Sequence, residues 1–368
     1  MRATACARVH TGALRHNLAE LRRRAPGYRV MAVIKSNGYG HGLVAAATAL
    51  DAADAFAVAR MEEALRLREA GIDKPLVLLE GVFDAHDLAL ARAQRLELVV
   101  HSGEQVRLLT GSPPELPLTV WLKVDTGMHR LGIAPADVAE AVRALRASPA
   151  VAELRLMTHF AQAERVQDGM TPAQIRALQA AADGFDGAVT LANSAAILGW
   201  KPDLDAMAAG SPSLGPAWIR PGICLYGISP FPDETGAELG LEPAMEFLST
   251  LIAVKPVAAG ERVGYGGRYR AERDMRLGIA AVGYGDGYPW CMPDGTPVLV
   301  AGRRAPIAGR VSMDMITVDL SDLPEAAVGD EVMLWGRALP VEEVARYAGT
   351  IPYELVCRVT ERVIKVTE

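Results

Sequence analysis

The clearest candidate for chemistry in this chain is Lys35, because of the residues around it. It follows the apolar run VMAVI and opens the string KSNGYGHG, which contains three glycines, a tyrosine and a histidine. A lysine that ends a buried strand is costly unless it is paired or neutral. Desolvation lowers the pKa of such a lysine, and a neutral amine can form a Schiff base. The lysine alone is better explained by an ammonium that reaches solvent, but the whole string at 32–42 favours a catalytic group.

Three other motifs hold reactive or ligand-binding residue types. Tyr265 lies in the glycine turn GYGG, Arg220 precedes a proline, and Asn193 and Ser194 end an apolar run in NSAA. A phosphate is bound by backbone N–H groups and hydroxyls, often where a helix starts, and Ser194 is expected to cap a helix there. Taken singly, these residues are more simply a turn aromatic, a surface arginine and a helix cap.

Together, these strings resemble the signature motifs of alanine racemases, and they follow that family's order along nearly the whole chain. The string at 32–42 is similar to the family's pyridoxal-phosphate lysine segment. One such string would be weak evidence, whereas nine in the same order are a specific signal. The other eight are KVDTGMHRLG (123–132), MTHF (157–160), NSAA (193–196), RPGICLYG (220–227), VGYG (263–266), GYGDGY (283–288), SMDM (312–315) and TIPYELVC (350–357).

The resemblance implies a racemase that uses pyridoxal 5′-phosphate and two catalytic bases, Lys35 and Tyr265. Lys35 would also hold the cofactor covalently. Racemisation needs one group that removes the α-proton and another that returns a proton on the opposite face. In the family the lysine serves the D-face, and the tyrosine, which comes from the second subunit, serves the L-face. We therefore expect a homodimer with shared active sites, in which a monomer is inactive.

Tyr265 needs help to act as a base, because an ordinary tyrosine has a pKa near ~10. The family's counterparts of His159 and Arg220 link this tyrosine to the ring nitrogen of the cofactor. A guanidinium does not release its proton, so Arg220 implies an unprotonated ring nitrogen and a weaker electron sink. That arrangement suppresses side reactions such as transamination.

The resemblance assigns further contacts residue by residue. Arg130 would contact the 3′-oxygen of the cofactor and the substrate carboxylate, which Met313 would also bind through its backbone N–H. Lys123 matches a lysine that is often carbamylated, a modification that would place an anion beside Arg130. Tyr284 and Asp314 match residues at the narrow entrance to the site. The remaining cofactor contacts, most of them to the phosphate, are assigned to Tyr39, Asn193, Ser194, Gly222, Ile223 and Tyr353.

Two details bear on specificity and on rigidity. Related enzymes that act on larger side chains often replace the tyrosine at position 353, so Tyr353 favours alanine. Lys35 is followed by Ser-Asn-Gly, where the family usually has Ala-Asn/Asp-Ala. We expect Gly38 to loosen the loop beside the lysine.

The elements that must position these residues are predicted by the apolar runs. Eight short runs alternate with amphipathic stretches of helical period, such as 61–71, 136–148 and 171–185. Repeated strand-then-helix units indicate a parallel sheet, and eight units over about 230 residues indicate a TIM-like (β/α)8 barrel in an α/β protein. Lys35 would then lie at the carboxyl end of the barrel, where such folds hold their active sites. The runs are 30–35, 55–60, 75–81, 96–100, 118–125, 153–160, 188–193 and 223–227.

The pattern changes near residue 230, where prolines and glycine interrupt the chain. Strand-like runs then follow one another through Gly/Pro turns, and only 340–349 has a clear helical period. We therefore predict two domains: a cofactor-binding barrel at 1–232 and a mostly-β domain at 233–368 that contributes to the partner's active site. The strand-like runs are 249–257, 276–285, 297–302, 315–320 and 330–336.

The composition excludes several classes of protein. The 368 residues are 50% hydrophobic and 22% charged, as in a packed globular protein. The net charge of −6 leaves no basic surplus for nucleic acid. No apolar run could span a membrane and the amino terminus lacks the pattern of a secretory signal, so we expect a cytoplasmic protein. The four cysteines have no metal-ligand spacing, and we expect free thiols and no metal.

Other functions stay open at this point. The nearest is a serine racemase, or one of broader specificity, with the same cofactor and bases. A non-catalytic barrel that carries the cofactor is a different class, but such relatives have one domain and lack the tyrosine. A decarboxylase with this cofactor would be expected to have an acid at the ring nitrogen, where this chain has Arg220. A racemase could supply D-alanine for peptidoglycan or degrade it, because both roles use the same chemistry.

Overall fold

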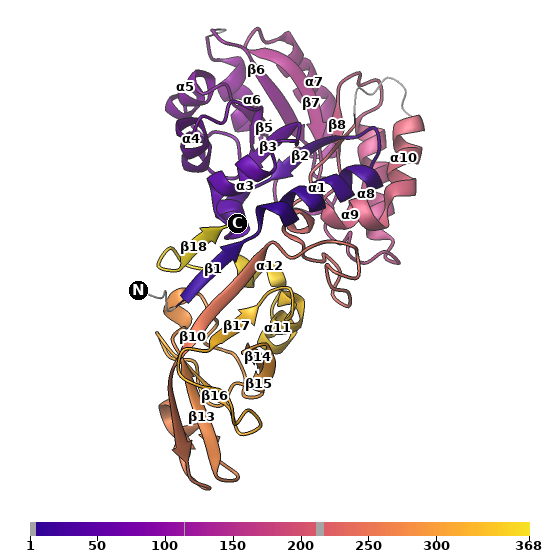
Figure 1. The fold of residues 1–368 in the computed structure, drawn as a ribbon. Helices are drawn as coiled ribbons and strands as arrows, with labels where there is room; N and C mark the ends of the chain where they lie inside the picture. Colours follow the sequence, from indigo (N-terminus) through magenta and orange to yellow (C-terminus); the bar gives the residue numbers. More distant parts are fainter. Residues whose placement is uncertain (1–4, 114, 211–216) are drawn as a thin grey trace.

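Eight short parallel strands close into a barrel in the computed structural model of this chain, which describes residues 5–113, 115–210 and 217–368 (Figure 1). The first and last strands pair through Arg29 with Trp218, which closes the barrel. Helices cover the outside and side chains fill the inside, which is why the strands are continuously apolar. The predicted barrel is confirmed. Its strands are β2 Arg29–Val33, β3 Ala55–Val58, β4 Leu76–Leu78, β5 Glu97–Val100, β6 Leu118–Lys123, β7 Val151–Met157, β8 Val189–Thr190 and β9 Trp218–Ile219.

The prediction of the eighth strand at 223–227 is wrong. The strand is β9, only two residues long, and Ile223–Tyr226 form the 3-10 helix η2. All four residues of η2 are buried. A short, fully buried apolar run has the same sequence pattern in a strand and in a helix, so periodicity could not distinguish the two. We expect no secretory signal at the amino terminus. Residues 1–4 of that stretch lie outside the described residues.

Helices follow the barrel strands and form its outer layer (Figure 1). The amphipathic stretches predicted at 61–71, 136–148 and 171–185 are confirmed as helices α4, α7 and α8. The helices of this part are α1 Thr11–Arg24, α2 Lys35–Tyr39, α3 Leu43–Ala49, α4 Met61–Glu69, α5 Ala85–Ala93, α6 Gly103–Thr110, η1 Pro135–Asp137, α7 Val138–Ala147, α8 Met170–Ala181, α9 Ser194–Gly199 and α10 Lys201–Gly210.

The carboxyl-terminal part is mostly β, as predicted, and one long strand organises it. Strand β10 pairs with β1 and β17 along its first half and with β13 along its second half. A bulge between Leu251 and Ala253 marks the change of partner. The further elements are β10 Met245–Val257, β11 Arg262–Val263, η3 Tyr265–Gly267, β12 Tyr269–Arg270, β13 Met275–Ala280, η4 Tyr284–Asp286, β14 Pro297–Val300, β15 Arg303–Pro306, β16 Ile316–Asp319, β17 Glu331–Trp335, α11 Val341–Ala348, α12 Pro352–Cys357 and β18 Ile364–Thr367.

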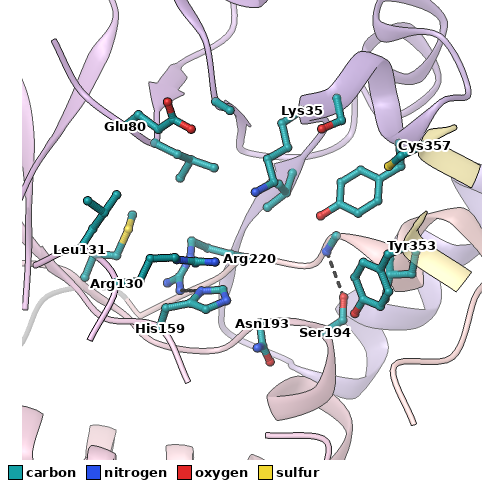
Figure 2. A pocket seen from close by; sticks show the side chains of 18 of the residues that line it. Lys35, Glu80, Arg130, Leu131, His159, Asn193, Ser194, Arg220, Tyr353 and Cys357 are labelled. Atoms are coloured by element: carbon teal, nitrogen blue, oxygen red, sulfur yellow. Dashed lines mark hydrogen bonds between the residues drawn. The ribbon is translucent and has the colours of Figure 1, made fainter. Parts of the chain in front are cut away.

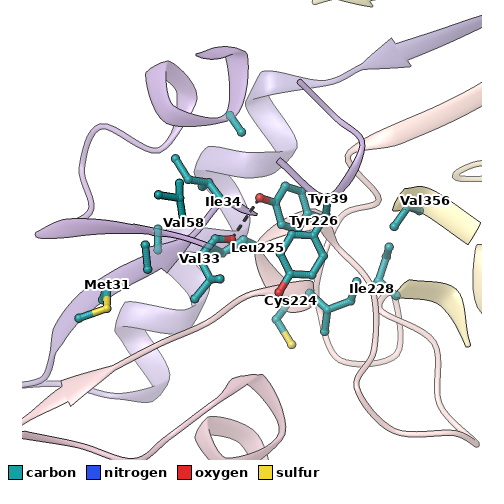
Figure 3. Packing of buried hydrophobic residues seen from close by; sticks show 14 of the residues in the cluster. Met31, Val33, Ile34, Tyr39, Val58, Cys224, Leu225, Tyr226, Ile228 and Val356 are labelled. Carbon is teal, nitrogen blue, oxygen red and sulfur yellow. Dashed lines mark hydrogen bonds between the residues drawn. The ribbon is translucent and has the colours of Figure 1, made fainter. Parts of the chain in front are cut away.

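The first strand, β1 Ala5–Val9, belongs to this carboxyl-terminal sheet and not to the barrel. It pairs antiparallel with β10 and parallel with β18. The boundary expected between residues 232 and 233 therefore does not divide the two parts completely. Strand β1 lies before this boundary in the sequence but belongs to the sheet that follows it. One continuous hydrophobic cluster joins the two parts, and Figure 3 shows Tyr39 and Tyr226 of the barrel close to Val356 of α12.

A buried ion pair crosses the interior of the barrel. Arg155 is 8% exposed and lies over two indole rings, with its guanidinium carbon 5.0 Å from the ring centre of Trp121 and 5.5 Å from that of Trp218. Since β6 and β9 are not neighbours, these two rings meet inside the barrel. The Glu97 carboxylate accepts from Trp121 Nε1 at 2.7 Å and from Arg155 Nη1 at 3.2 Å.

The first prediction concerns this pair. Arg155→Ala would leave the Glu97 carboxylate buried without its cation, which typically costs about 3–5 kcal/mol. We expect a loss of that size in the free energy of unfolding by urea, followed by tryptophan fluorescence.

Arg146→Ala is the matched control. Arg146 also pairs with a carboxylate, that of Asp186, and lies 5.0 Å from the ring centre of Phe185, but the pair is at the surface. An exposed pair contributes about 0–1 kcal/mol. Equal losses in the two variants would contradict a special role for the buried pair.

Candidate active site

A cavity of about 440 Å³ opens at the carboxyl end of the barrel (Figure 2). The loops after all eight strands meet at this end in such folds, which brings together residues far apart in sequence. Eleven of the residues predicted from the sequence line it, together with Glu80, Cys357 and several apolar side chains. The eleven are Lys35, Tyr39, Lys123, Arg130, His159, Asn193, Ser194, Arg220, Gly222, Ile223 and Tyr353.

A left-handed turn directly after β2 fixes the position of Lys35. Ser36, Asn37, Gly38 and Tyr39 all have φ between 49° and 64°. Each residue other than glycine pays a cost in this conformation. Gly38 does not, and a Cβ there would lie 3.1 Å from Ala46 Cβ. Glycine suits this position, because it adopts the left-handed conformation without strain.

Burial lowers the pKa of Lys35, and the nearby charge of Arg130 lowers it further. Glu80 and Glu63 oppose this effect. A lowered pKa increases the fraction of neutral amine, which is the form that attacks a carbonyl or accepts a proton. Figure 2 shows the Lys35 amine inside the cavity.

Arg220 lies on the cavity floor, held by neutral acceptors. It is 4% exposed; its Nη1 donates to Thr190 Oγ1 at 2.6 Å and its Nη2 to the carbonyl oxygen of Thr158 at 2.6 Å. Burial lowers the pKa of Arg220 to about 9, so the guanidinium stays charged at neutral pH.

Arg220 also fixes the state of its neighbour His159. Arg220 Nη2 lies 3.3 Å from His159 Nδ1. Since a guanidinium can only donate, Nδ1 must accept, and a neutral His159 carries its proton on Nε2. Burial lowers the pKa of His159 well below its ordinary value, and the charge of Arg220 adds to this effect. The histidine is thus neutral at physiological pH.

Lys123 completes a group of four cationic residues. It is 8% exposed, and burial together with the charges of Arg220, Arg130 and Lys35 lowers its pKa to about 8. Among the described residues that line the cavity, Glu80 is the only acid. Such a surplus of positive charge in one cavity suits a ligand that carries several negative charges.

In one corner of the cavity, a serine hydroxyl lies beside backbone N–H groups. Ser194 Oγ accepts the backbone N–H of Gly222 at 3.0 Å and of Cys224 at 3.4 Å. The helix α9 is capped by Asn193, whose Oδ1 accepts the N–H of Ala196 at 3.0 Å, so the prediction of Ser194 as the cap is wrong by one residue. The Ser194 hydroxyl is held at the cavity instead.

Two tyrosines form the other side of this corner. Tyr39 stacks on Tyr226 with 4.8 Å between ring centres, and its ring lies 6.2 Å from that of Tyr353. Burial raises the pKa of Tyr39 and Tyr353, so both hydroxyls keep their protons and can donate. A Cβ on Gly222 would lie 2.5 Å from the Tyr39 hydroxyl, so only glycine permits this approach.

Four predicted site residues lie elsewhere on the same chain. Tyr265 is 72% exposed, Met313 52% and Tyr284 41%, and Asp314 is exposed and bound to Arg362 at 2.7 Å. All four belong to the carboxyl-terminal part, and none lines the cavity. Backbone hydrogen bonds join the turn that holds Tyr284 to the loop that holds Met313. The structure thus divides the predicted site residues into a cavity group and an exposed group.

The sequence-based reasoning missed Cys357 and Glu80. Cys357 follows Tyr353 by four residues on α12, a spacing that places both on one helix face and could have revealed it. Glu80 ends an apolar run that was predicted as a strand, which is the position of an active-site residue in a barrel.

Other expectations concern the cysteines, metal sites and membrane spans. All four cysteines, at positions 6, 224, 291 and 357, are free thiols, as expected. No cluster of three metal-ligating side chains occurs in the part of the chain that the structure describes. None of the described helices combines the length and apolarity that crossing a membrane requires.

Comparisons with known proteins agree with this geometry. The family model "Alanine racemase, N-terminal domain" matches residues 9–230, and "Alanine racemase, C-terminal domain" matches residues 244–367. The chain belongs to the alanine racemase family. An alanine racemase of Aliivibrio salmonicida is 49% identical over 362 residues, covering 98% of each chain, and one of Shewanella baltica OS185 is 50% identical over 358 residues, covering 97% of each.

Solved structures of the family share the whole fold. The biosynthetic alanine racemase of Pseudomonas aeruginosa is 48% identical, with a TM-score of 0.93 and complete coverage of both chains. The enzyme of Acinetobacter baumannii is 35% identical, with a TM-score of 0.89 and the same coverage.

Alanine racemases depend on pyridoxal 5′-phosphate, and the cavity of this family member fits that group. Its volume lies in the range of small-molecule sites. Lys35 offers an amine for the aldehyde, and Arg220 offers a fixed charged donor. The hydroxyls of Ser194 and Tyr39 meet beside Gly222, where a phosphate could approach the backbone.

The second prediction tests this corner. In Gly222→Ala the new Cβ would displace the Tyr39 hydroxyl, which it would otherwise approach to 2.5 Å. Loss of a hydrogen bond to a charged group costs about 1.5–3 kcal/mol, so we expect the affinity for pyridoxal 5′-phosphate to fall roughly tenfold or more. Titration of the cofactor-free protein, followed by visible absorption, measures this.

Gly169→Ala serves as the control substitution. Gly169 has an ordinary φ of −74° and no atom within 4 Å of the new Cβ. We expect unchanged cofactor affinity in this variant. Unchanged affinity in Gly222→Ala as well would place the phosphate elsewhere.

Proposed function

We propose that this chain interconverts L- and D-alanine, with pyridoxal 5′-phosphate as its cofactor. The observation that carries the proposal is the match to alanine racemases at 49–50% identity over 97–98% of both chains. Tyr353 in the cavity wall supports a small substrate. We infer a cytoplasmic enzyme from the sequence pattern alone. A role in D-alanine supply for peptidoglycan is consistent with the relative described as biosynthetic.

The two proposed bases act on opposite faces of the substrate α-carbon. Bound pyridoxal 5′-phosphate supplies an electron-withdrawing ring that makes the α-proton acidic. Lys35 Nζ takes or returns the proton on one face. On the other face the Tyr265 oxygen takes a proton as phenolate or returns one as hydroxyl. Arg130 binds the substrate carboxylate together with the backbone N–H of Met313. Arg220 would donate a hydrogen bond to the ring nitrogen and keep its proton, so the nitrogen would stay unprotonated.

The proposal includes a homodimer with shared sites. Tyr265 and Met313 are 72% and 52% exposed, and neither lines the cavity that holds Lys35 on the same chain. An exposed tyrosine in a turn is ready to enter the cavity of a second copy. A closed two-fold dimer would pair each Lys35 with the Tyr265 of the other chain.

We also propose that Lys123 is carbamylated. Its pKa of about 8 leaves part of the amine neutral near pH 7, and a neutral amine can bond to carbon dioxide with release of a proton. The product is an anion beside Arg130 and Arg220, which relieves the repulsion among the cations.

The third prediction follows from this modification. Lys123→Glu keeps an anion near Arg130 and Lys123→Met does not. We expect the glutamate variant to keep roughly tenfold more kcat/KM, which corresponds to about 1.4 kcal/mol. Equal activity of the two variants would argue against an anion at this position.

The substrate assignment is tested on the purified protein, which should turn over L-alanine faster than L-serine or L-lysine. Faster turnover of serine would contradict alanine as the substrate.

The fourth prediction tests the two-base assignment. Tyr265→Phe should nearly abolish racemisation, because phenylalanine has no ionisable hydroxyl, while the visible absorption of the cofactor bound to Lys35 persists. Unchanged activity of this variant would contradict the two-base assignment.

Mixing two inactive variants tests the shared sites. A dimer of one Lys35→Ala chain and one Tyr265→Phe chain contains one intact site and one site with both defects. Random exchange of subunits should therefore restore about a quarter of the wild-type activity. The double variant mixed with itself is the control, and it should stay inactive. No recovery in the first mixture would mean that each chain supplies its own tyrosine.

A further inference from the structure

Glu80 is the charged residue of the cavity to which the proposed function gives no role. It follows β4, and its side chain extends into the same space as that of Lys35 (Figure 2). Among the described lining residues it is the only acid beside four cations. A carboxylate in such a place either offsets positive charge or excludes negatively charged ligands.

The backbone that carries Glu80 is firmly held. Its carbonyl oxygen accepts from His101 Nε2 and from Gln105 Nε2, each at 3.1 Å. Gln105 is 5% exposed and also donates to the carbonyl of Val82 at 3.2 Å. The side chain is less constrained, because its one ion pair is with Arg60 at 3.6 Å, a residue that is 71% exposed. The backbone thus fixes the position of Glu80 in the cavity wall. Its carboxylate can turn toward groups inside the cavity.

The other carboxylate near Lys35 is already engaged. Glu63, on α4, accepts the backbone N–H of Asn37 at 3.1 Å and of Ala59 at 3.1 Å. These bonds hold the left-handed turn and the end of β3. The charge of Glu63 also acts on Lys35, but these bonds fix its carboxylate, so Glu80 is the acid that can approach the Lys35 amine from within the cavity.

The remaining groups around Lys35 oppose an ammonium or are neutral. Arg130 and Lys123 are cations that face it from the loop after β6 and the end of that strand. Cys357 faces it from α12, but burial raises the pKa of this thiol to about 11, so it stays protonated. Without Glu80, a protonated Lys35 would have mainly cations as neighbours.

We propose that Glu80 is a positioning residue that holds the Lys35 ammonium at the cavity rim each time Lys35 carries a proton. The role of Lys35 as a base rests on the proposed function, whereas its pairing with Glu80 does not. In the D-to-L direction Nζ gains the α-proton and its positive charge, and Glu80 stays ionised throughout. In the reverse direction the same nitrogen gives a proton to the α-carbon and becomes neutral.

The fifth prediction measures the pairing directly. In the full-length protein without cofactor, Lys35 should react faster with an amine-reactive anhydride in Glu80→Gln than in the wild type. Removing the anion leaves more neutral amine, and we expect roughly threefold or faster labelling at pH 8, measured on the Lys35 peptide by mass spectrometry.

Glu62→Gln is the matched control. Glu62 is exposed on α4, next to Glu63, and does not influence the pKa of Lys35. It should label as the wild type does. Equal labelling of Lys35 in Glu80→Gln and Glu62→Gln would overturn the proposal.

The loaded enzyme gives a second readout, the pH dependence of kcat in each direction. With D-alanine, where Lys35 is the base, the acid limb should move to lower pH in Glu80→Gln. With L-alanine, where Tyr265 is the base, the acid limb should stay in place. Movement of both limbs, or of neither, would overturn the positioning role. A wild type that does not racemise alanine would refute the proposed function, while the labelling would still decide the pairing.

Discussion

The positive charge enclosed at the mouth of the barrel constrains the rest of this structure. Lys35, Lys123, Arg130 and Arg220 line one cavity with Glu80 as the only acid among the described lining residues. Gathering like charges in one cavity is unfavourable unless an anion compensates them. Burial lowers the pKa of both lysines, and the neighbouring cations lower it further. A cofactor with a phosphate and a substrate with a carboxylate supply the missing negative charge. Ligand binding therefore relieves the repulsion among these cations.

The barrel brings these charged groups together at the ends of its strands. Lys35, Arg220 and the other lining residues follow different strands but lie at the same rim. The local backbone then orients each side chain. The left-handed turn from Ser36 to Tyr39 aims the lysine and a tyrosine at the cavity. Neutral acceptors around Arg220 keep it charged without giving it an ionic partner, which leaves the guanidinium available to a ligand.

The carboxyl-terminal part explains why the predicted site residues fall into a cavity group and an exposed group. The thirteen-residue strand β10 runs away from the barrel, and β13 and β16 lie at the far end of the molecule (Figure 1). Tyr265 lies in η3 and Met313 in the loop before β16, and both are exposed. The first half of this strand pairs with β1 and belongs to the core that reaches the barrel. Its last residue, Val257, belongs to a second, smaller cluster with Val263, and Tyr265 follows Val263 by two residues.

The sequence by itself determined the barrel, the mostly-β tail and eleven of the residues that line the cavity, because helical and strand periods are local and the motifs name their residues. Tertiary structure alone decided the rest. Residues 223–226 are buried in either conformation, so only the pairing of β9 identified the last strand. The place of β1 depends on partners more than 200 residues away. Which oxygen caps α9, and which acid faces Lys35, depend on contacts between distant strand ends that no local pattern records.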